Sequence, residues 1–211
     1  MAERIIIADD HPLFRTALSH AVGKVWPDAD IVETGSAAAA REQLADNADA
    51  LLLDLHMEDS NGLTVLMDLR QEHPALPIVI VSASEEPRVY AAASQLGAAA
   101  FIPKSSSLDE MRSALSAVRD GENWFPQMDE AADGDLQRIA NLTPAQRRIL
   151  GQIREGLLNK QIAYELDISE ATVKAHITAI FRKLGVVSRT QAAMLATKLD
   201  VDQPSADISP N

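Results

Sequence analysis

The stretch Ala50-Leu51-Leu52-Leu53-Asp54 has four apolar residues in a row and ends on an acid. A half-buried strand alternates apolar and polar residues, whereas this run is apolar at every position and has the length of a strand. It therefore predicts a parallel β-strand that is covered on both faces. Residues 78–81, Ile78-Val79-Ile80-Val81, show the same pattern.

Other short apolar runs lie on both sides of these two, and stretches of helical length with apolar residues three or four apart separate them. Strands that alternate with helices predict βαβ units, and hence a doubly wound α/β domain with a parallel sheet and helices on both faces. The five predicted strands are Arg4–Ala8, Asp30–Thr34, Ala50–Leu53, Ile78–Val81 and Ala99–Ile102.

The βαβ pattern stops near Asp120, and the rest of the chain predicts only helices. We expect a domain over residues 1–120, a linker over 121–141, an all-α domain of four helices over 142–199 and a flexible tail over 200–211. Thr143-Pro144-Ala145-Gln146 is a helix start signal, with Thr143 as N-cap and Gln146 three residues later. Helices over 159–166 and from Glu170 onward, joined by a tight turn, form a helix-turn-helix pattern.

Composition excludes several classes of protein. None of the 211 residues is a cysteine, which excludes a disulfide scaffold, a thiol nucleophile and a Cys-ligated metal site. Because no run approaches about 18 apolar residues and the N-terminus does not resemble a signal peptide, we expect a cytoplasmic protein without a membrane segment.

The charge is unevenly distributed along the chain. The net charge is −12 overall, but it is −11 over residues 1–126 and +5 over residues 142–199. Such asymmetry is typical of a sensor joined to a domain that binds a polyanion, although charge alone favours this reading no more than chance variation.

Polar residues follow four of the predicted strands. Asp9 and Asp10 follow the first strand, Asp54 the third, Ser82 the fourth and Lys104 the fifth. The carboxyl ends of parallel strands form the ligand-binding edge of an open α/β sheet. Three carboxylates there repel one another, so we expect Lys104 and a hard cation such as Mg²⁺ to offset them. Asp54 can then act as a nucleophile and form an aspartyl phosphate, with Ser82 and Lys104 contacting the phosphoryl oxygens.

Residues 1–120 resemble the receiver domain of two-component response regulators. The motifs that carry this resemblance are Ile7-Ala8-Asp9-Asp10-His11-Pro12, Leu52-Leu53-Asp54-Leu55, Val81-Ser82-Ala83 and Phe101-Ile102-Pro103-Lys104. The resemblance implies the strand order 2-1-3-4-5 and transfer of a phosphoryl group to Asp54 from a sensor histidine kinase. It also implies Mg²⁺ held by Asp10, Asp54 and the backbone carbonyl of His56, with Asp9 acting through water. On phosphorylation, Ser82 is expected to approach the phosphate and Phe101 to turn inward.

The loop after Asp54 departs from the family pattern. The family usually has Met-Pro-Gly where this chain has Met57-Glu58-Asp59. Loss of the proline frees the backbone, and two acids add negative charge near the phosphate, so we expect effects on metal affinity and phosphate lifetime.

The helix from Glu170 has two distinct faces. Val173, Ile177, Ile180 and Leu184 form an apolar stripe, and the opposite face carries Lys174, Ala175, Thr178 and Arg182. If this helix enters the major groove, Lys174 is placed to reach base edges and Lys160 and Thr172 to contact phosphates. The alternative is an ordinary small helical bundle whose charged face is merely solvated.

Residues 142–199 resemble the LuxR-type DNA-binding domain over their whole length. The motifs are Leu142-Thr143-Pro144, the run from Gly156 to Ala163, Thr172-Val173-Lys174-Ala175-His176 and Lys183-Leu184-Gly185-Val186. The domain order is that of NarL/LuxR-type response regulators. The resemblance implies a transcriptional regulator that binds double-stranded promoter DNA as a homodimer, with RNA polymerase as a candidate partner. The last helix offers a candidate dimer face, with packing on its own domain as the alternative: Ala192, Leu195, Ala196 and Leu199.

Two rival functions remain open from the sequence. One is a regulator that ignores phosphate and is controlled by dimerisation or a partner protein. The other is a phosphatase or phosphotransferase that uses an aspartyl phosphate. Such enzymes usually have a second acid two residues after the nucleophile, and His56 occupies that place, so we expect no enzyme.

Overall fold

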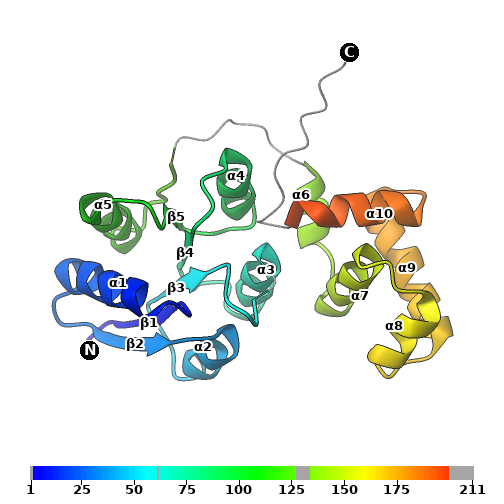
Figure 1. The fold of residues 1–211 in the computed structure, drawn as a ribbon, viewed down its shortest axis with the longest axis horizontal. Helices are drawn as coiled ribbons and strands as arrows, with labels where there is room; N and C mark the ends of the chain where they lie inside the picture. Colours follow the sequence, from blue (N-terminus) through cyan, green and yellow to red (C-terminus); the bar gives the residue numbers. More distant parts are fainter. Residues whose placement is uncertain (1, 61, 127–133, 200–211) are drawn as a thin grey trace, which may run out of the picture. The chain divides into compact units, whose positions relative to one another are not determined.

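The computed structural model describes residues 2–60, 62–126 and 134–199, and the chain divides into two compact units, Met1–Gln137 and Arg138–Asn211 (Figure 1). The predicted tail over residues 200–211 and part of the predicted linker lie outside the described residues. No helix in the described part of the chain combines the length and the apolar character that crossing a membrane requires.

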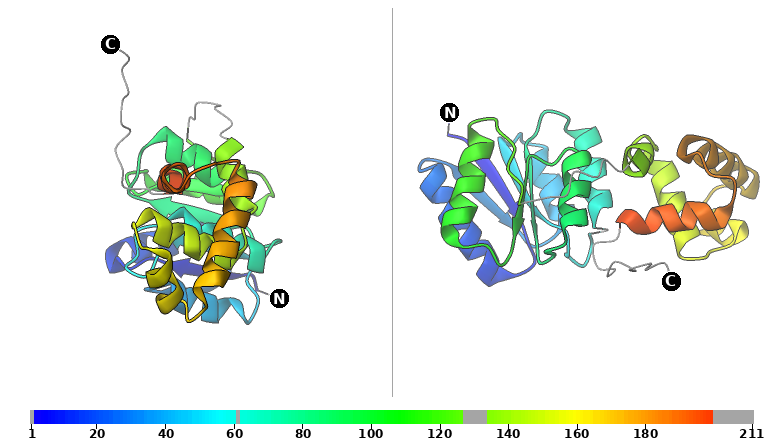
Figure 2. Two further views of the ribbon diagram at one scale, coloured as in Figure 1. Left: turned by 90° about the vertical axis from the view of Figure 1, so that its right-hand side faces the viewer. Right: turned by 90° about the horizontal axis from the view of Figure 1, so that it is seen from above.

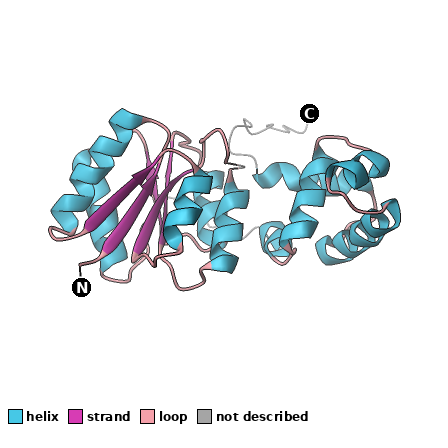
Figure 3. Ribbon diagram, turned by 90° about the horizontal axis from the view of Figure 1, so that it is seen from below, coloured by secondary structure: helices cyan, strands magenta, loops and turns pink. Residues whose placement is uncertain are grey.

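The first unit contains a five-stranded parallel sheet in the order β2-β1-β3-β4-β5, as expected. Helices cover both faces of the sheet, as Figures 2 and 3 show from two sides. The strands are β1 Arg4–Ala8, β2 Asp30–Thr34, β3 Ala50–Asp54, β4 Ile78–Ser82 and β5 Ala100–Pro103. The helices are α1 Pro12–Val25, α2 Ala37–Leu44, α3 Leu63–Glu72, α4 Pro87–Gln95 and α5 Leu108–Arg119.

Strands β3 and β4 each extend one residue beyond the prediction. Asp54 pairs with Val81, and Ser82 pairs with Pro103, so both polar residues are the last members of their strands rather than loop residues. A residue that belongs to the ladder has its backbone fixed by the neighbouring strand. The structure therefore holds Asp54 and Ser82 more rigidly than a loop would.

The two faces of the sheet bury different sets of residues. Every residue of β3 and β4 is buried, as parallel strands covered on both sides require. Alternate residues of the strands pack with α1 and α5 in one apolar core, which includes Ile5, Leu52 and Val79 from the strands and Leu18 and Leu115 from the helices.

The segment after α5 continues along the free edge of the sheet. Trp124 forms an isolated parallel bridge with Ala100, in which its amide donates to Ala99 O at 3.1 Å and the Phe101 amide donates to Trp124 O at 3.0 Å. Residues 121–126 of the predicted linker are thus attached to β5. The weak helical stretch that the sequence predicts around residues 133–139 corresponds to α6, Gly134–Ala140.

The second unit is helical. Thr143 is the N-cap of the first of its four main helices, where it forms a capping box with Gln146, as predicted. These helices bury a common apolar core that includes Ile149, Ile162, Val173 and Ile180. They are α7 Pro144–Arg154, α8 Asn159–Glu165, α9 Glu170–Leu184 and α10 Arg189–Ala196, and a 3₁₀ turn, η1 Thr197–Leu199, follows them.

We expect Leu52→Ala to lower the free energy of unfolding of the first unit by about 2–5 kcal/mol, because it leaves a cavity in the middle of β3. Leu13→Ala, at a residue that is 89% exposed, is the matched control and should change that free energy by less than about 0.5 kcal/mol. Both tryptophans, Trp26 and Trp124, lie in the first unit, so urea unfolding followed by tryptophan fluorescence reports on that unit. Equal losses for the two variants would contradict the assigned core.

Candidate functional site

The carboxyl ends of β1, β3 and β5 meet at one cation. Lys104, directly after β5, places its Nζ 2.8 Å from Oδ2 of Asp9 and 2.8 Å from Oδ2 of Asp54. Both carboxylates are fully buried, and so is Ser82 at the end of β4. The structure thus brings together the polar groups that the sequence places at these strand ends.

Asp54 is held by hydrogen bonds on both carboxylate oxygens. Its Oδ1 accepts from the His56 amide at 3.0 Å, and its Oδ2 accepts from Lys104 at 2.8 Å. Burial by itself raises the pKa of Asp54, but the hydrogen bonds from His56 and Lys104 outweigh burial and hold the pKa below its ordinary value of 3.8. The buried carboxylate is therefore ionised at neutral pH, as a nucleophile must be.

Lys104 is charged for the reciprocal reason. Burial lowers the pKa of Lys104, but hydrogen bonds to Asp54 and Asp9, together with their charges, raise it above its ordinary value of 10.5. The ammonium also lies 5.0 Å from the centroid of the Phe14 ring on α1, where a cation–π contact adds to its attraction.

A group of possible metal ligands includes Asp54. One atom each from Asp9, Asp10, His11 and Asp54 lies within 4.8 Å of the others. Asp9 Oδ2 is buried and accepts from Lys104 Nζ at 2.8 Å, whereas Asp10 Oδ1 is buried and accepts no hydrogen bond from the described residues, with His11 Nδ1 2.5 Å away. Buried carboxylate oxygens with unused lone pairs fit a hard divalent cation, which prefers oxygen ligands.

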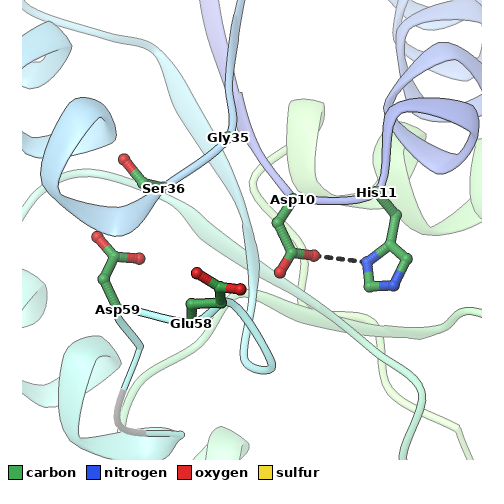
Figure 4. Close-up of a pocket in the computed structure, with 6 residues that line it drawn as sticks. All are labelled: Asp10, His11, Gly35, Ser36, Glu58 and Asp59. Atoms are coloured by element: carbon green, nitrogen blue, oxygen red, sulfur yellow. Dashed lines mark ion pairs between the residues drawn. The ribbon is translucent and has the colours of Figure 1, made fainter.

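Sequence reasoning overlooked two histidine side chains here. His11 Nδ1 lies 2.5 Å from Asp10 Oδ1, and the dashed line in Figure 4 marks this pair. The sequence indicates no contact for the His56 ring, but its Nδ1 lies 3.3 Å from Ser82 Oγ and 3.7 Å from Asp54 Oδ1. The adjacency of His11 to Asp10 was the available signal for the first, whereas nothing local indicated the second.

Phe101 is fully buried, and the centroid of its ring lies 4.6 Å from the ring centroid of Tyr90 on α4. The inward position is therefore the one that this structure holds. A movement of Phe101 on phosphorylation stays a prediction.

An open cavity of about 380 Å³ lies beside the acidic group (Figure 4). Glu58 and Asp59, from the loop that departs from the family pattern, line it together with Asp10, His11, Gly35 and Ser36. The two acids differ in their contacts, because Asp59 accepts hydrogen bonds from the backbone amides of Ala37 and Ala38 at the start of α2.

The helix-turn-helix pattern of the sequence is formed by α8 and α9. Asp167 has a φ of 51° in the connecting turn, and Ser169 caps α9 by accepting from the Thr172 amide at 3.1 Å. On α9, Val173, Ile180 and Leu184 are buried and Ile177 is half-buried. The residues predicted to contact DNA are exposed: Lys160, Thr172, Lys174, Ala175, Thr178 and Arg182.

Glu170 is a further residue that the sequence analysis overlooked. Its Oε1 lies 3.2 Å from Lys174 Nζ, one turn further along α9, and the i,i+4 spacing of the two residues was the available signal. Lys174, near the start of α9, is thus paired in this structure.

The predicted dimer face of the last helix needs correction. Ala192, Ala196 and Leu199 are buried in the chain's own unit, where α10 packs against α7, so they cannot form contacts with a second chain in this conformation. The apolar stripe of this helix serves its own core, which was the alternative reading. Leu195 is half-buried, and the exposed face of α10 carries Thr190, Gln191 and Met194.

Two family models match the chain. The model of the response regulator receiver domain matches residues 5–116, and that of bacterial regulatory proteins of the luxR family matches residues 140–196.

Curated relatives match almost the whole chain. A glycerol metabolism activator from Pseudomonas putida is 38% identical over 93% of this chain and 96% of its own length. The transcriptional activator DevR/DosR of Mycobacterium tuberculosis is 31% identical over 97% of this chain and 98% of its own. The nitrate/nitrite response regulator NarL of Escherichia coli is 33% identical over 90% of this chain and 93% of its own.

Solved structures share the fold. RcsB from Salmonella enterica serovar Typhimurium, bound to the promoter P1flhDC, matches with a TM-score of 0.56 at 23% identity, over 95% of this chain and 100% of that one. At this level of identity the likeness concerns the fold alone. From the two family models and the curated relatives, we conclude that the chain belongs to the response regulators that join a receiver domain to a LuxR-type DNA-binding domain.

Proposed function

We propose that this chain regulates transcription and that phosphorylation of Asp54 by a sensor histidine kinase switches it. The observation that carries the proposal is the Lys104 ammonium 2.8 Å from both Asp9 and Asp54. This ammonium explains why the carboxylate of Asp54 is ionised although it is buried at the end of a strand. Phosphorylation-switched transcription is the norm of the family to which the chain belongs.

The proposed transfer has Asp54 as nucleophile. A carboxylate oxygen attacks the phosphorus of a phosphohistidine, and the new O–P bond forms as the P–N bond breaks. The imidazole of the kinase keeps the electron pair of the broken bond and takes up a proton. Lys104 then pairs with a phosphoryl oxygen, and the Ser82 hydroxyl donates to another.

The acidic group fits Mg²⁺ as the metal of the site. Asp10, Asp54 and the backbone carbonyl of His56 would hold the ion, with Asp9 acting through water. When bound, Mg²⁺ offsets the charge of the transferring phosphoryl group. The grouping of the Asp9, Asp10 and Asp54 carboxylates at this edge of the sheet supports this assignment.

Ser82 and Phe101 form the proposed switch. Ser82 Oγ contacts the His56 ring and accepts from the Ser84 amide at 3.1 Å, so it must leave these partners to reach a phosphate. The amide of Phe101 donates to Trp124 O, so a shift of β5 at Phe101 is passed directly to the segment that follows α5.

The DNA interface is proposed for the exposed face of α9 and the start of α8. Lys174 would reach base edges together with Ala175, Thr178 and Arg182, and Lys160 and Thr172 would contact phosphates. The net charge of +5 over residues 142–199 supports attraction to the DNA backbone, and the exposure of all six residues supports their access to DNA.

We further propose that the chain acts on promoter DNA as a homodimer and that RNA polymerase is a candidate partner there. A dimer matches two half-sites of an operator through its two-fold symmetry. One solved structure similar in fold is described as two RcsB dimers bound to two parallel DNAs. On α10 the exposed residues Thr190 and Met194 replace the buried ones as the candidate dimer contact.

Incubation with acetyl phosphate and Mg²⁺ should add one phosphoryl group to the wild-type chain and none to Asp54→Asn, as intact mass spectrometry would show. The amide has no ionised oxygen with which to attack phosphorus. Equal labelling of both proteins would remove Asp54 as the acceptor. Absence of labelling in both would favour a regulator that is controlled by dimerisation or a partner, and continuous turnover of the donor would favour an enzyme.

Lys104→Met should raise the pKa of Asp54, because the ammonium that stabilises the ionised carboxylate is lost. The pKa of wild-type Asp54 lies below its ordinary value, so the ionised group contributes stability above pH 3.8 that is lost as the pH falls through the folded-state pKa. The free energy of unfolding of Lys104→Met should therefore fall less at acid pH than that of the wild-type chain does. Carboxyl ¹³C titration by NMR measures the pKa, with the exposed Lys24→Met as control, and an unchanged value would contradict the assigned pair.

Lys174→Ala should weaken binding to operator DNA by about 1–3 kcal/mol and binding to random DNA much less, because a base contact is lost. Lys160→Ala should weaken binding to both DNAs alike and lower the salt slope by about one, because a phosphate contact is lost. Titrations at several salt concentrations separate the two outcomes. Equal losses on both DNAs for Lys174→Ala would show that α9 does not read bases there.

A further inference from the structure

The loop between Asp54 and α3 is tied to a different helix. Asp59 Oδ1 accepts from the Ala37 amide and Oδ2 from the Ala38 amide, both at 2.9 Å. Asp59 and these two alanines are more than 20 residues apart in sequence, so the contact joins the acceptor loop to the start of α2. In the close-up of the cavity, Asp59 lies beside Ser36 (Figure 4).

This contact completes the N-terminus of α2. The first amides of a helix have no partner within the helix, and they attract a negative charge. The Asp59 carboxylate accepts hydrogen bonds from two of these amides, and the Ser36 side chain accepts one from the third, Ala39 N, at 3.1 Å. The helix start thus binds part of the chain itself, and the charge of Asp59 is taken up there instead of adding freely to that of Asp9, Asp10 and Asp54.

The remainder of the loop is held by short-range hydrogen bonds. Ser60 N donates to Met57 O at 2.9 Å, and Ser60 Oγ donates to Leu55 O at 3.0 Å. At the other end, the His56 amide donates to Asp54 Oδ1. These bonds fix the shape of the loop, the His56 ring contacts Ser82 at the end of β4, and the Asp59 carboxylate binds the loop to the start of α2.

We propose that Asp59 is a positioning residue of the acceptor site, which holds the backbone of the loop, and with it the His56 carbonyl, in place for Mg²⁺. This proposal rests on the proposed function of Asp54. In the proposal, the hydrogen bonds between the Asp59 carboxylate and the start of α2 restrain the loop. A proline supplies this restraint where the family has Met-Pro-Gly. Glu58 and Asp59 both line the cavity, but the two backbone amides at the start of α2 bind Asp59.

The competing explanation is a helix cap that matters only for stability. Ser36→Ala provides the matched control, because it removes a cap of the same helix and leaves the loop tether intact. Asp59→Asn is nearly isosteric but turns an NH₂ group toward one of the two amides, so it weakens the tether. Both variants should therefore destabilise α2, and only Asp59→Asn should alter the acceptor loop.

The test is a calorimetric titration of each full-length variant with Mg²⁺ in the absence of a phosphodonor, accompanied by a thermal melt. Removal of a group that orients a metal ligand directly typically costs about 10–100-fold in metal affinity. Asp59 holds the loop backbone and does not contact a ligand directly, so we expect a smaller loss of about 3- to 10-fold for Asp59→Asn. Ser36→Ala should stay within about twofold of wild type. The Mg²⁺ concentration that half-saturates labelling by acetyl phosphate should shift in parallel.

Two outcomes would overturn the proposal: an equal shift in Mg²⁺ affinity for both variants, or no shift for Asp59→Asn. Asp59→Glu, which keeps the charge but lengthens the side chain, is expected to fall between wild type and Asp59→Asn, and it serves if Asp59→Asn does not fold. Labelling that persists in Asp54→Asn would instead overturn the proposed function. The two failures are therefore distinguishable.

Discussion

The ammonium group of Lys104 lies between the buried carboxylates of Asp9 and Asp54, and the arrangement of the strand ends depends on this contact. Asp9 and Asp54 end up at one edge of the sheet because β1 and β3 are parallel neighbours. Two unit charges about 4 Å apart interact by about 4 kcal/mol at an effective dielectric of 20, so two such carboxylates require compensation. Lys104 supplies it from the end of β5, 2.8 Å from each. A phosphoryl group on Asp54 would compete for the same ammonium, which makes this pair sensitive to phosphorylation.

Strand β5 connects this charge to the rest of the unit. The Lys104 amide donates to Ser82 O at 2.7 Å, Phe101 packs against Tyr90, and Trp124 lies along the outer edge of the strand. Lys104 thus contacts β4 directly, and Phe101 on β5 contacts α4 and the segment after α5.

The loop after Asp54 lacks the family's proline but is held by a different contact, that of Asp59 with the start of α2. The sequence has Glu58-Asp59 where proline and glycine are usual, which by itself indicates a freer and more negative loop. In the structure Asp59 is bound by the amides of Ala37 and Ala38, so half of the added charge meets the positive end of α2. Glu58 lines the same cavity as Asp59.

The features that depend on local pattern could be predicted from the amino-acid sequence. The runs around Leu52 and Val79 predicted buried parallel strands because every residue was apolar. The acids and the lysine at the strand ends predicted a shared site because parallel strands end at one edge, and Thr143 predicted a helix start through its cap. How the helix-turn-helix meets DNA stays a prediction.

Which distant groups meet depends on how the elements pack together in three dimensions. The His56 ring reaches Ser82, Asp59 reaches α2 and Trp124 reaches β5 across separations that no periodicity encodes. The stripe of Ala192, Ala196 and Leu199 could have faced either its own core or a second chain, because an apolar helix face looks the same in both cases. Packing of α10 against α7 settled this choice, since burial depends on the partner surface and not on the helix alone.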